Sequence, residues 1–196
     1  MVWLVEIKPS FSVKAKLKIL TFDIENRPLS YWVIDRPTAE ITAIASCWSD
    51  DVGSMKVDLL GRDDPKQMLV NFVERYNEAD MVVGHYIRRH DLPIINGALM
   101  EYGLPLLLPK LTCDTKMDMY KKADIPASQE YLGDLFNLPI PKTHMSQNDW
   151  REANRLTVKG LEATERRVST DVLQNIMLRK KMLSLGLLKA PRMWRG

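Results

Sequence analysis

Cysteine is scarce in this 196-residue sequence, and long apolar runs are missing. The two cysteines, Cys47 and Cys113, lie in no Cys-x-x-Cys pair and no Cys/His zinc spacing. This pattern argues against a disulfide framework and favours a reducing compartment. No apolar stretch reaches the length of a membrane span. The apolar start Met1–Val5 is short and soon meets charged residues, so we expect no signal peptide and a cytoplasmic protein without membrane contact.

Repeats and low-complexity segments are also absent. The hydrophobic fraction of 45% and the charged fraction of 27% are typical of a globular protein. We therefore expect a single domain over residues 1–196, with a frayed basic tail from about residue 189. A net charge of +3 permits nucleic acid as a partner without requiring it.

Alternating and periodic apolar residues predict an α/β fold. Strands are expected over 16–24, 40–48, 55–60, 79–83 and 111–114. Asn26-Arg27-Pro28 should end the first strand, and a turn over 50–53 should make the first three strands an antiparallel meander. A helix beginning at Pro65 crosses over to the fourth strand, which makes its parallel pairing with the first plausible. Further helices are expected over 92–102, 128–137 and 158–188, with a loop over 139–146. The prediction is a mixed five-stranded sheet, a meander plus parallel strands, flanked by helices.

The first candidate site residues are two acids at the end of an apolar strand. Side chains alternate along a strand, so Asp23 and Glu25 should point the same way, about 7 Å apart. Two like charges placed together become reasonable when a divalent cation lies between them. The alternative is a pair of solvated acids where the strand meets a loop.

A third acid, Asp91, follows the fourth predicted strand. Ligands of open α/β sheets bind at the carboxyl ends of the strands, so Asp91 could meet Asp23 and Glu25 there. Asp91 is alternatively the N-cap of the helix that starts at Leu92-Pro93.

The fourth acid, Asp171, lies inside the last amphipathic helix. Its neighbours Val168 and Val172 are apolar, which places Asp171 beside the buried stripe. The alternative is a boundary acid paired with Arg167 or Asn175 one turn away.

Together these residues resemble the motifs of the DnaQ-like (DEDD) 3′–5′ exonucleases, which share the ribonuclease H-like fold. The matching stretches are Phe22-Asp23-Ile24-Glu25, Gly84-His85 through Asp91-Leu92-Pro93, and Asp171-Val172. The nearest type is the proofreading exonuclease of family B DNA polymerases. The resemblance implies that Asp23, Glu25, Asp91 and Asp171 hold two Mg²⁺ or Mn²⁺ ions about 4 Å apart and are catalytic. It also implies a DNA or RNA 3′ end as substrate, single-stranded DNA above all, and a polymerase or replication partner. Asp114, which precedes Thr115, and His85 would not bind the metals themselves but would support the residues that do.

The sequence departs from that family at two motifs. Tyr86 and His90 stand where the second motif usually has Asn and an aromatic residue. Arg167 and Arg166 stand where relatives place the Tyr or His that orients the attacking water, and Arg cannot act as a general base. Three readings follow. Another group such as His90, His144 or Tyr131 positions the water, the metals suffice at a reduced rate, or the protein binds nucleic-acid ends without cutting them efficiently.

Basic and aromatic side chains near the motifs are candidates for nucleic-acid contact. Phosphates could be bound by Arg27, Arg88, Arg89 and Arg167. Trp32 and Trp150 could stack on bases, although core packing is at least as common for tryptophan. Three functions therefore remain open: a metal-dependent 3′–5′ exonuclease, a non-catalytic nucleic-acid-binding module, and an endonuclease of the same fold.

Overall fold

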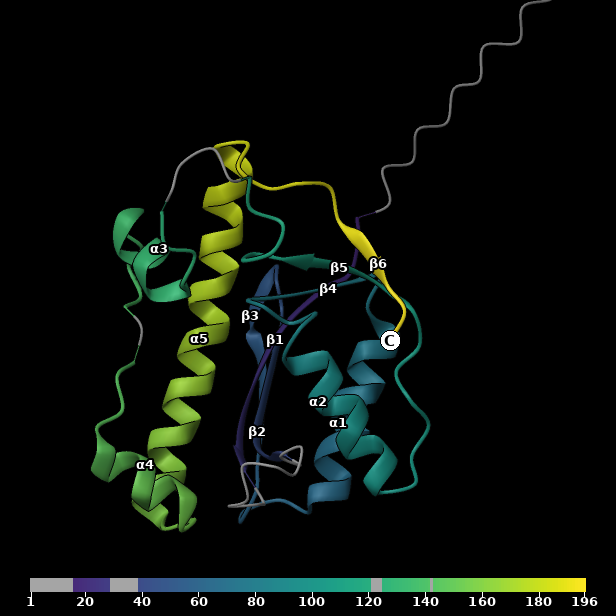
Figure 1. The fold of residues 1–196 in the computed structure, drawn as a ribbon, viewed down its shortest axis with the longest axis vertical. Helices are drawn as coiled ribbons and strands as arrows, with labels where there is room; N and C mark the ends of the chain where they lie inside the picture. Colours follow the sequence, from purple (N-terminus) through teal and green to yellow (C-terminus); the bar gives the residue numbers. More distant parts are fainter. Residues whose placement is uncertain (1–15, 29–38, 121–124, 142) are drawn as a thin grey trace, which may run out of the picture.

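A six-stranded mixed sheet forms the centre of the protein (Figure 1). The computed structural model describes residues 16–28, 39–120, 125–141 and 143–196. The strand order is β3-β2-β1-β4-β5-β6. Their bounds are β1 Ile19–Pro28, β2 Ala39–Trp48, β3 Asp51–Leu59, β4 Met81–Gly84, β5 Lys110–Asp114 and β6 Arg192–Trp194. The first three strands are antiparallel, β4 and β5 run parallel to β1, and β6 is antiparallel to β5.

Helices cover both faces of this sheet (Figure 1). Helices α1 (Pro65–Glu78) and α2 (Asp91–Glu101) lie on one face, and α5 (Val158–Ser184) lies on the other. Helices α3 (Gln129–Leu135) and α4 (Gln147–Asn154) flank α5. We refer below to the α1/α2 face and the α5 face of the sheet.

The α1/α2 face holds the larger apolar core. Helix α1 begins where Asp64 caps it, because the Asp64 side chain accepts a hydrogen bond from the Gln67 amide and Pro65 occupies the first turn. Its buried residues recur at helical spacing and pack on the inward side chains of β1. The Phe72 ring lies 4.9 Å from that of Phe22. This layer anchors the strand that carries the first two acids.

The sheet and meander confirm the predicted α/β architecture, with differences at the ends of elements. Strand β1 does not stop at Asn26 but continues to Pro28, because a register shift after Glu25 lets it stay paired with β2. The turn between β2 and β3 is Ser49-Asp50, so of the residues expected as the turn, Asp50 lies in it and residues 51–53 belong to β3.

The C-terminal half differs from the prediction at three places. The tail expected to be frayed forms β6, the sixth strand, because its backbone pairs with the edge of β5. Helix α4 was missed because its short polar sequence has little apolar periodicity, although the capping box between Ser146 and Asp149 was a local signal of its start. The last helix ends at Ser184 rather than at residue 188, and Leu183 near its end is half exposed.

Within the described ranges, no helix combines the length and the apolar character needed to cross a bilayer. The two cysteines are both buried free thiols.

Candidate metal centre

Alternation along β1 directs the two strand acids toward α5. Leu20, Phe22 and Ile24 belong to the core on the α1/α2 face. The intervening Asp23 and Glu25 therefore lie together on the α5 face, as their alternation along the strand predicted. After Glu25 the pairing register between β1 and β2 shifts, so the alternation of side chains along β1 is interrupted there.

Small residues on β2 let α5 lie close to these acids. Ala43, Ala45 and Cys47 are buried against Val168 and Val172 of the helix. Because Asp171 immediately precedes Val172, it is carried to the sheet and is only 4% exposed. One carboxylate oxygen from each of Asp23, Glu25 and Asp171 lies within 4.8 Å of the others. We call these three residues the acid cluster.

Asp91 lies next to the acid cluster without being one of its three members. It is the first residue of α2, and its Oδ1 accepts a hydrogen bond of 3.3 Å from the Ile24 amide. The N-cap position belongs to His90, so Asp91 does not cap the helix in the way the alternative reading proposed. Burial, together with the charges of Asp114 and Glu25, raises the pKa of Asp91 to about 7.

The loop before α2 reaches β1 because of a glycine. A Cβ on Gly84 would lie 2.2 Å from the Ile87 side chain and 2.9 Å from the Phe22 carbonyl oxygen, so only glycine permits this approach. The chain then turns at Tyr86, whose φ of 70° is in the left-handed region. Asparagine, the usual residue there in the resembling family, adopts this region more readily than tyrosine.

Asp114, at the end of β5, is hydrogen-bonded to the same loop. Its carboxylate accepts hydrogen bonds from the backbone amides of Tyr86, Arg88, Lys116 and Met117, at 2.9 to 3.2 Å. It is completely buried at the end of β5. Through these contacts Asp114 ties the loop that leads to Asp91 to the end of β5. His85 also points to this region, where its Nδ1 lies 3.0 Å from the Thr115 hydroxyl.

Arg167 occupies the place where the resembling family has a tyrosine, and it contacts the acid cluster. Its Nε donates to Glu25 Oε1 at 2.5 Å, and its Nη2 lies 3.9 Å from Asp171 Oδ2. The second contact is the i,i+4 pair with Arg167 that the alternative reading of Asp171 proposed. Burial lowers the pKa of Arg167, but the carboxylates of Glu25, Asp171 and Asp23 outweigh it, so the pKa is raised overall.

Other expected substrate-binding residues are engaged elsewhere. Arg88 makes a two-pronged ion pair with the buried Asp118 and its side chain is 10% exposed, so we reassign it from phosphate binding to holding the loop. Arg27 pairs with Glu40 across the meander at 2.6 Å and also donates to the Asn154 carbonyl oxygen. Arg89 is exposed in the loop before α2 and stays a candidate for phosphate contact.

The residues expected to position water lie outside the acid cluster. His90 is hydrogen-bonded to the Asn26 side chain at 3.1 Å, and burial lowers its pKa. His144 is largely exposed and lies 3.1 Å from Glu130 of α3. Tyr131 is an exposed residue of the same helix. Trp32 is outside the described residues.

Asp118 was not among the residues predicted for the site, yet it is completely buried and accepts hydrogen bonds from Arg88 and from the Asp114 amide. The available signal was the spacing of two acids, Asp114 and Asp118, directly after an apolar strand. Gln129 of α3 was also missed. Its side chain donates to the Asp171 carbonyl oxygen at 2.8 Å and helps fix that turn of α5.

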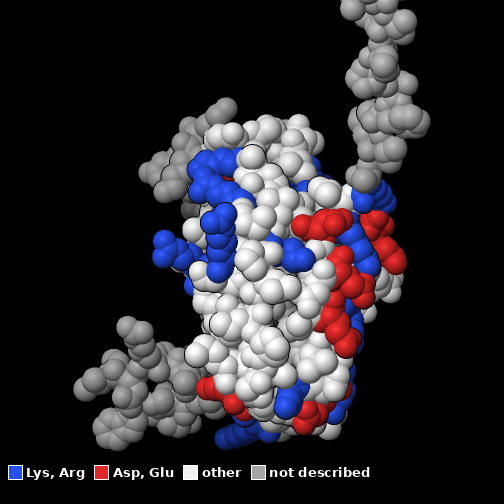
Figure 2. Space-filling model, turned by 90° about the vertical axis from the view of Figure 1, so that its right-hand side faces the viewer, with Lys and Arg blue, Asp and Glu red and all other residues white. Residues whose placement is uncertain are grey.

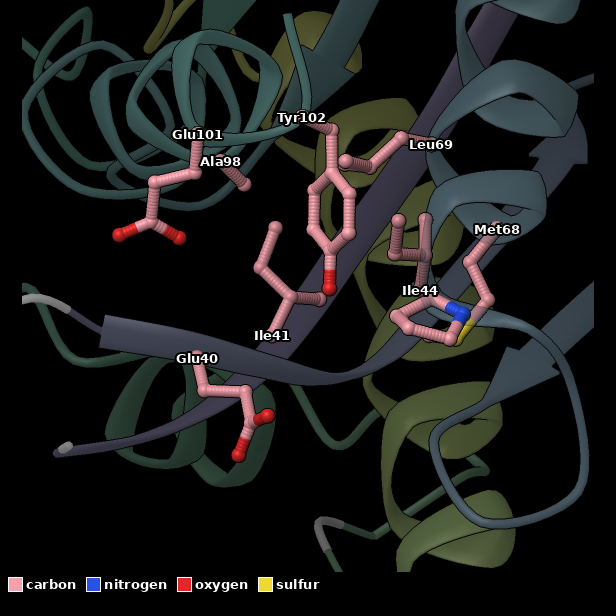
Figure 3. Close-up of a pocket in the computed structure, with 9 residues that line it drawn as sticks. Glu40, Ile41, Ile44, Met68, Leu69, Ala98, Glu101 and Tyr102 are labelled. Atoms are coloured by element: carbon pink, nitrogen blue, oxygen red, sulfur yellow. The ribbon is translucent and has the colours of Figure 1, made fainter.

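Two hollows of the surface differ in their relation to the acid cluster. The one in Figure 3 lies on the α1/α2 face, where the Tyr102 ring reaches toward β2 between Ile41 and Leu69. None of the three acids lines it. A second hollow of about 230 Å³ lies beside α5 and is lined by Thr143, which accepts a hydrogen bond from Arg167, and by Arg166 and Lys159. This second hollow adjoins the candidate site.

The mixed sheet, its strand order and the helices on both faces define a ribonuclease H-like fold. Three carboxylates from β1 and α5 form a group that could hold a metal ion. No protein-family model and no curated protein matches this sequence. Among solved structures, the chain is similar to the family B DNA polymerase from the hyperthermophilic archaeon Pyrobaculum calidifontis, with a TM-score of 0.64 and 19% identity. The similarity covers 86% of this chain but only 25% of the polymerase, and at this identity it shows the fold alone.

Proposed function

We propose that this protein is a metal-dependent nuclease that removes nucleotides from the 3′ ends of nucleic acids, with single-stranded DNA as its main substrate. The observation that carries the proposal is the acid cluster, in which oxygens from β1 and α5 lie within 4.8 Å of one another. The fold shared with a DNA polymerase supports nucleic acid as the substrate class. The 3′ polarity rests on the resemblance of the motifs to DnaQ-like exonucleases.

The donor set fits Mg²⁺ or Mn²⁺. Carboxylate oxygens are hard ligands that these cations prefer, and the acid cluster contains no sulfur or imidazole. We assign Asp23, Glu25 and Asp171 as ligands, with Asp91 completing a site for two ions. A divalent cation bound there would stabilise charge on the phosphoryl oxygens and acidify a bound water.

The surrounding residues orient the ligands and the substrate. Asp114 and Gln129 hold the Asp91 loop and the Asp171 turn, so both acids are fixed before a substrate arrives. Exposed Arg89 would bind a phosphate without sequence preference. Figure 2 shows the α1/α2 side, where the centre is largely uncharged, acidic residues lie along one edge and basic residues gather near the opposite edge.

The test is incubation of the purified protein with 5′-labelled single strands in Mg²⁺ or Mn²⁺. Stepwise shortening is expected with the native protein, and none is expected in EDTA or with Asp23→Asn. Equal shortening by Asp23→Asn would refute the proposal. A circular single strand should survive, since it has no end, and its cleavage would indicate an endonuclease instead.

A second candidate function is a nucleic-acid-binding module without efficient catalysis. The contact between Arg167 and Glu25 favours it, because a fixed positive charge stands where the resembling family has a water-orienting tyrosine. This candidate predicts binding of single strands that persists in EDTA, with no product after long incubation. A fluorescence-anisotropy titration beside the cleavage assay separates the two functions.

A further inference from the structure

Arg167 is held in place from four directions. Besides Glu25 and Asp171, its Nη1 donates to the Thr143 carbonyl oxygen at 3.0 Å, and its guanidinium lies 5.1 Å from the centre of the Trp150 ring. The Arg167 side chain is 18% exposed and that of Glu25 is 14% exposed. An ion pair this sheltered is screened less by solvent than a surface pair.

The guanidinium therefore supplies one positive charge directly to the acid cluster. Arginine stays protonated throughout the neutral pH range, so this charge is not lost by titration there. The oxygen that accepts from Arg167, Glu25 Oε1, belongs to a carboxylate that a divalent cation would need. Since both cations are attracted to the same carboxylate, occupation by one weakens occupation by the other.

We propose that Arg167 is the resident counter-ion of the acid cluster and competes with a divalent cation for Glu25. The native protein then binds the cation weakly, and Arg167 leaves Glu25 when the cation enters. The Thr143 carbonyl and the Trp150 ring give the displaced guanidinium a place to remain beside the site. This inference rests on the metal centre of the proposed function, and its test separates the two.

The first experiment measures Mn²⁺ binding by isothermal titration calorimetry and electron paramagnetic resonance. Arg167→Gln should bind Mn²⁺ about 10-fold to 100-fold more tightly than the native protein, the equivalent of one lost charge-assisted hydrogen bond. Arg166→Gln is the matched control, since it removes the same charge at the adjacent, exposed position of α5. It should change the affinity less than about 5-fold.

The outcomes distinguish the two proposals. Equal affinity of the native protein and Arg167→Gln, with binding abolished by Asp23→Asn, overturns the counter-ion proposal and leaves the metal centre intact. Absence of Mn²⁺ binding in every variant overturns both. An equal gain in Arg166→Gln and Arg167→Gln also overturns the counter-ion proposal, because the effect would then come from net charge alone.

A second experiment needs no variant to fold. The Nε–H resonance of Arg167 is followed in the native protein by ¹H–¹⁵N spectroscopy during addition of diamagnetic Mg²⁺. Loss of the hydrogen bond to Glu25 should move this resonance as the cation saturates the site, while arginines elsewhere stay unchanged. An unmoved Arg167 resonance at saturation would show both cations bound together and overturn the competition.

Discussion

The two faces of the sheet are built from different chemistry. On the α1/α2 face, aromatic and aliphatic side chains fill a single large cluster that includes Phe22, Phe72 and Tyr76. On the α5 face the apolar cluster is smaller, and next to it lie buried polar residues of the same helix: Asp171, Gln174 and Asn175. One face therefore supplies most of the apolar packing, whereas the other tolerates the buried charges that form the candidate site.

The largest expected effect tests the apolar face. Phe72→Ala should lower the free energy of unfolding by about 3–5 kcal/mol, because it removes a 1% exposed ring packed against two others. Urea denaturation measures this loss. Mn²⁺ affinity of the folded fraction should be unchanged, and a loss of binding would mean that the two faces are not independent.

Asp91 gives a pH-dependent test. Its ordinary pKa is near 3.9 and its pKa in the folded protein is about 7, so between these values the folded state keeps a proton that the unfolded state loses. Stability in EDTA should therefore fall as pH rises from about 4 to about 7, and Asp91→Asn should remove that slope.

The measurement compares urea unfolding of Asp91→Asn and the native protein in EDTA. The variant should match the native protein near pH 4 and exceed it by about 2–4 kcal/mol at pH 8, since an amide pays no cost for ionisation. The same difference at both pH values would contradict the assigned pKa.

A matched pair on β2 tests whether small residues set the distance from α5 to the acids. Ala45→Leu overfills the α5 face and should cost about 1–3 kcal/mol while weakening Mn²⁺ binding. Ile44→Val, the adjacent residue on the α1/α2 face, should cost about 0.5–1.5 kcal/mol with Mn²⁺ binding unchanged. Equal Mn²⁺ affinities in both variants would show that metal binding does not depend on how closely α5 packs against β2.

The smallest expected effect concerns the phase of α5. Leu183→Ser should change the free energy of unfolding by less than about 0.5 kcal/mol, because half of Leu183 is exposed. Met182→Ala, one residue earlier and fully buried, should cost about 2–5 kcal/mol. Thermal or urea unfolding of the two variants tests which of the two residues faces the core. A larger loss of stability from Leu183→Ser than from Met182→Ala would place Leu183 on the buried side of α5.

Much of the fold was accessible from local patterns. The apolar alternation of β1 and the capped, periodic helix α1 specify themselves within about ten residues, and both were predicted. Strand β6 was not, because three residues become a strand only when an edge of β5 is there to pair with them. Helix α4 depends in the same way on its neighbour. A Cβ on Gly160 of α5 would come within 2.2 Å of the Glu152 backbone, so the two helices need this glycine to pack.

The candidate site also combines features that local sequence predicts with features that depend on tertiary packing. The order and spacing of Asp23, Glu25, Asp91 and Asp171 indicated which residues to examine, and the packing of α5 on β2 brings three of them together. The role of Arg88 was misjudged, because its partner Asp118 could be recognised only once the loop and β5 were in place.

Local sequence specifies the alternation that puts two acids on one side of β1, and it shows a cation at position 167 where the resembling family has none. Folding of the whole chain is needed to bring Asp171 to those acids, to leave Asp91 beside them and to bind Arg167 to Glu25. The reason is physical. Alternation is a local property of the backbone, whereas the meeting of charges distant along the chain depends on how closely a helix packs against a sheet.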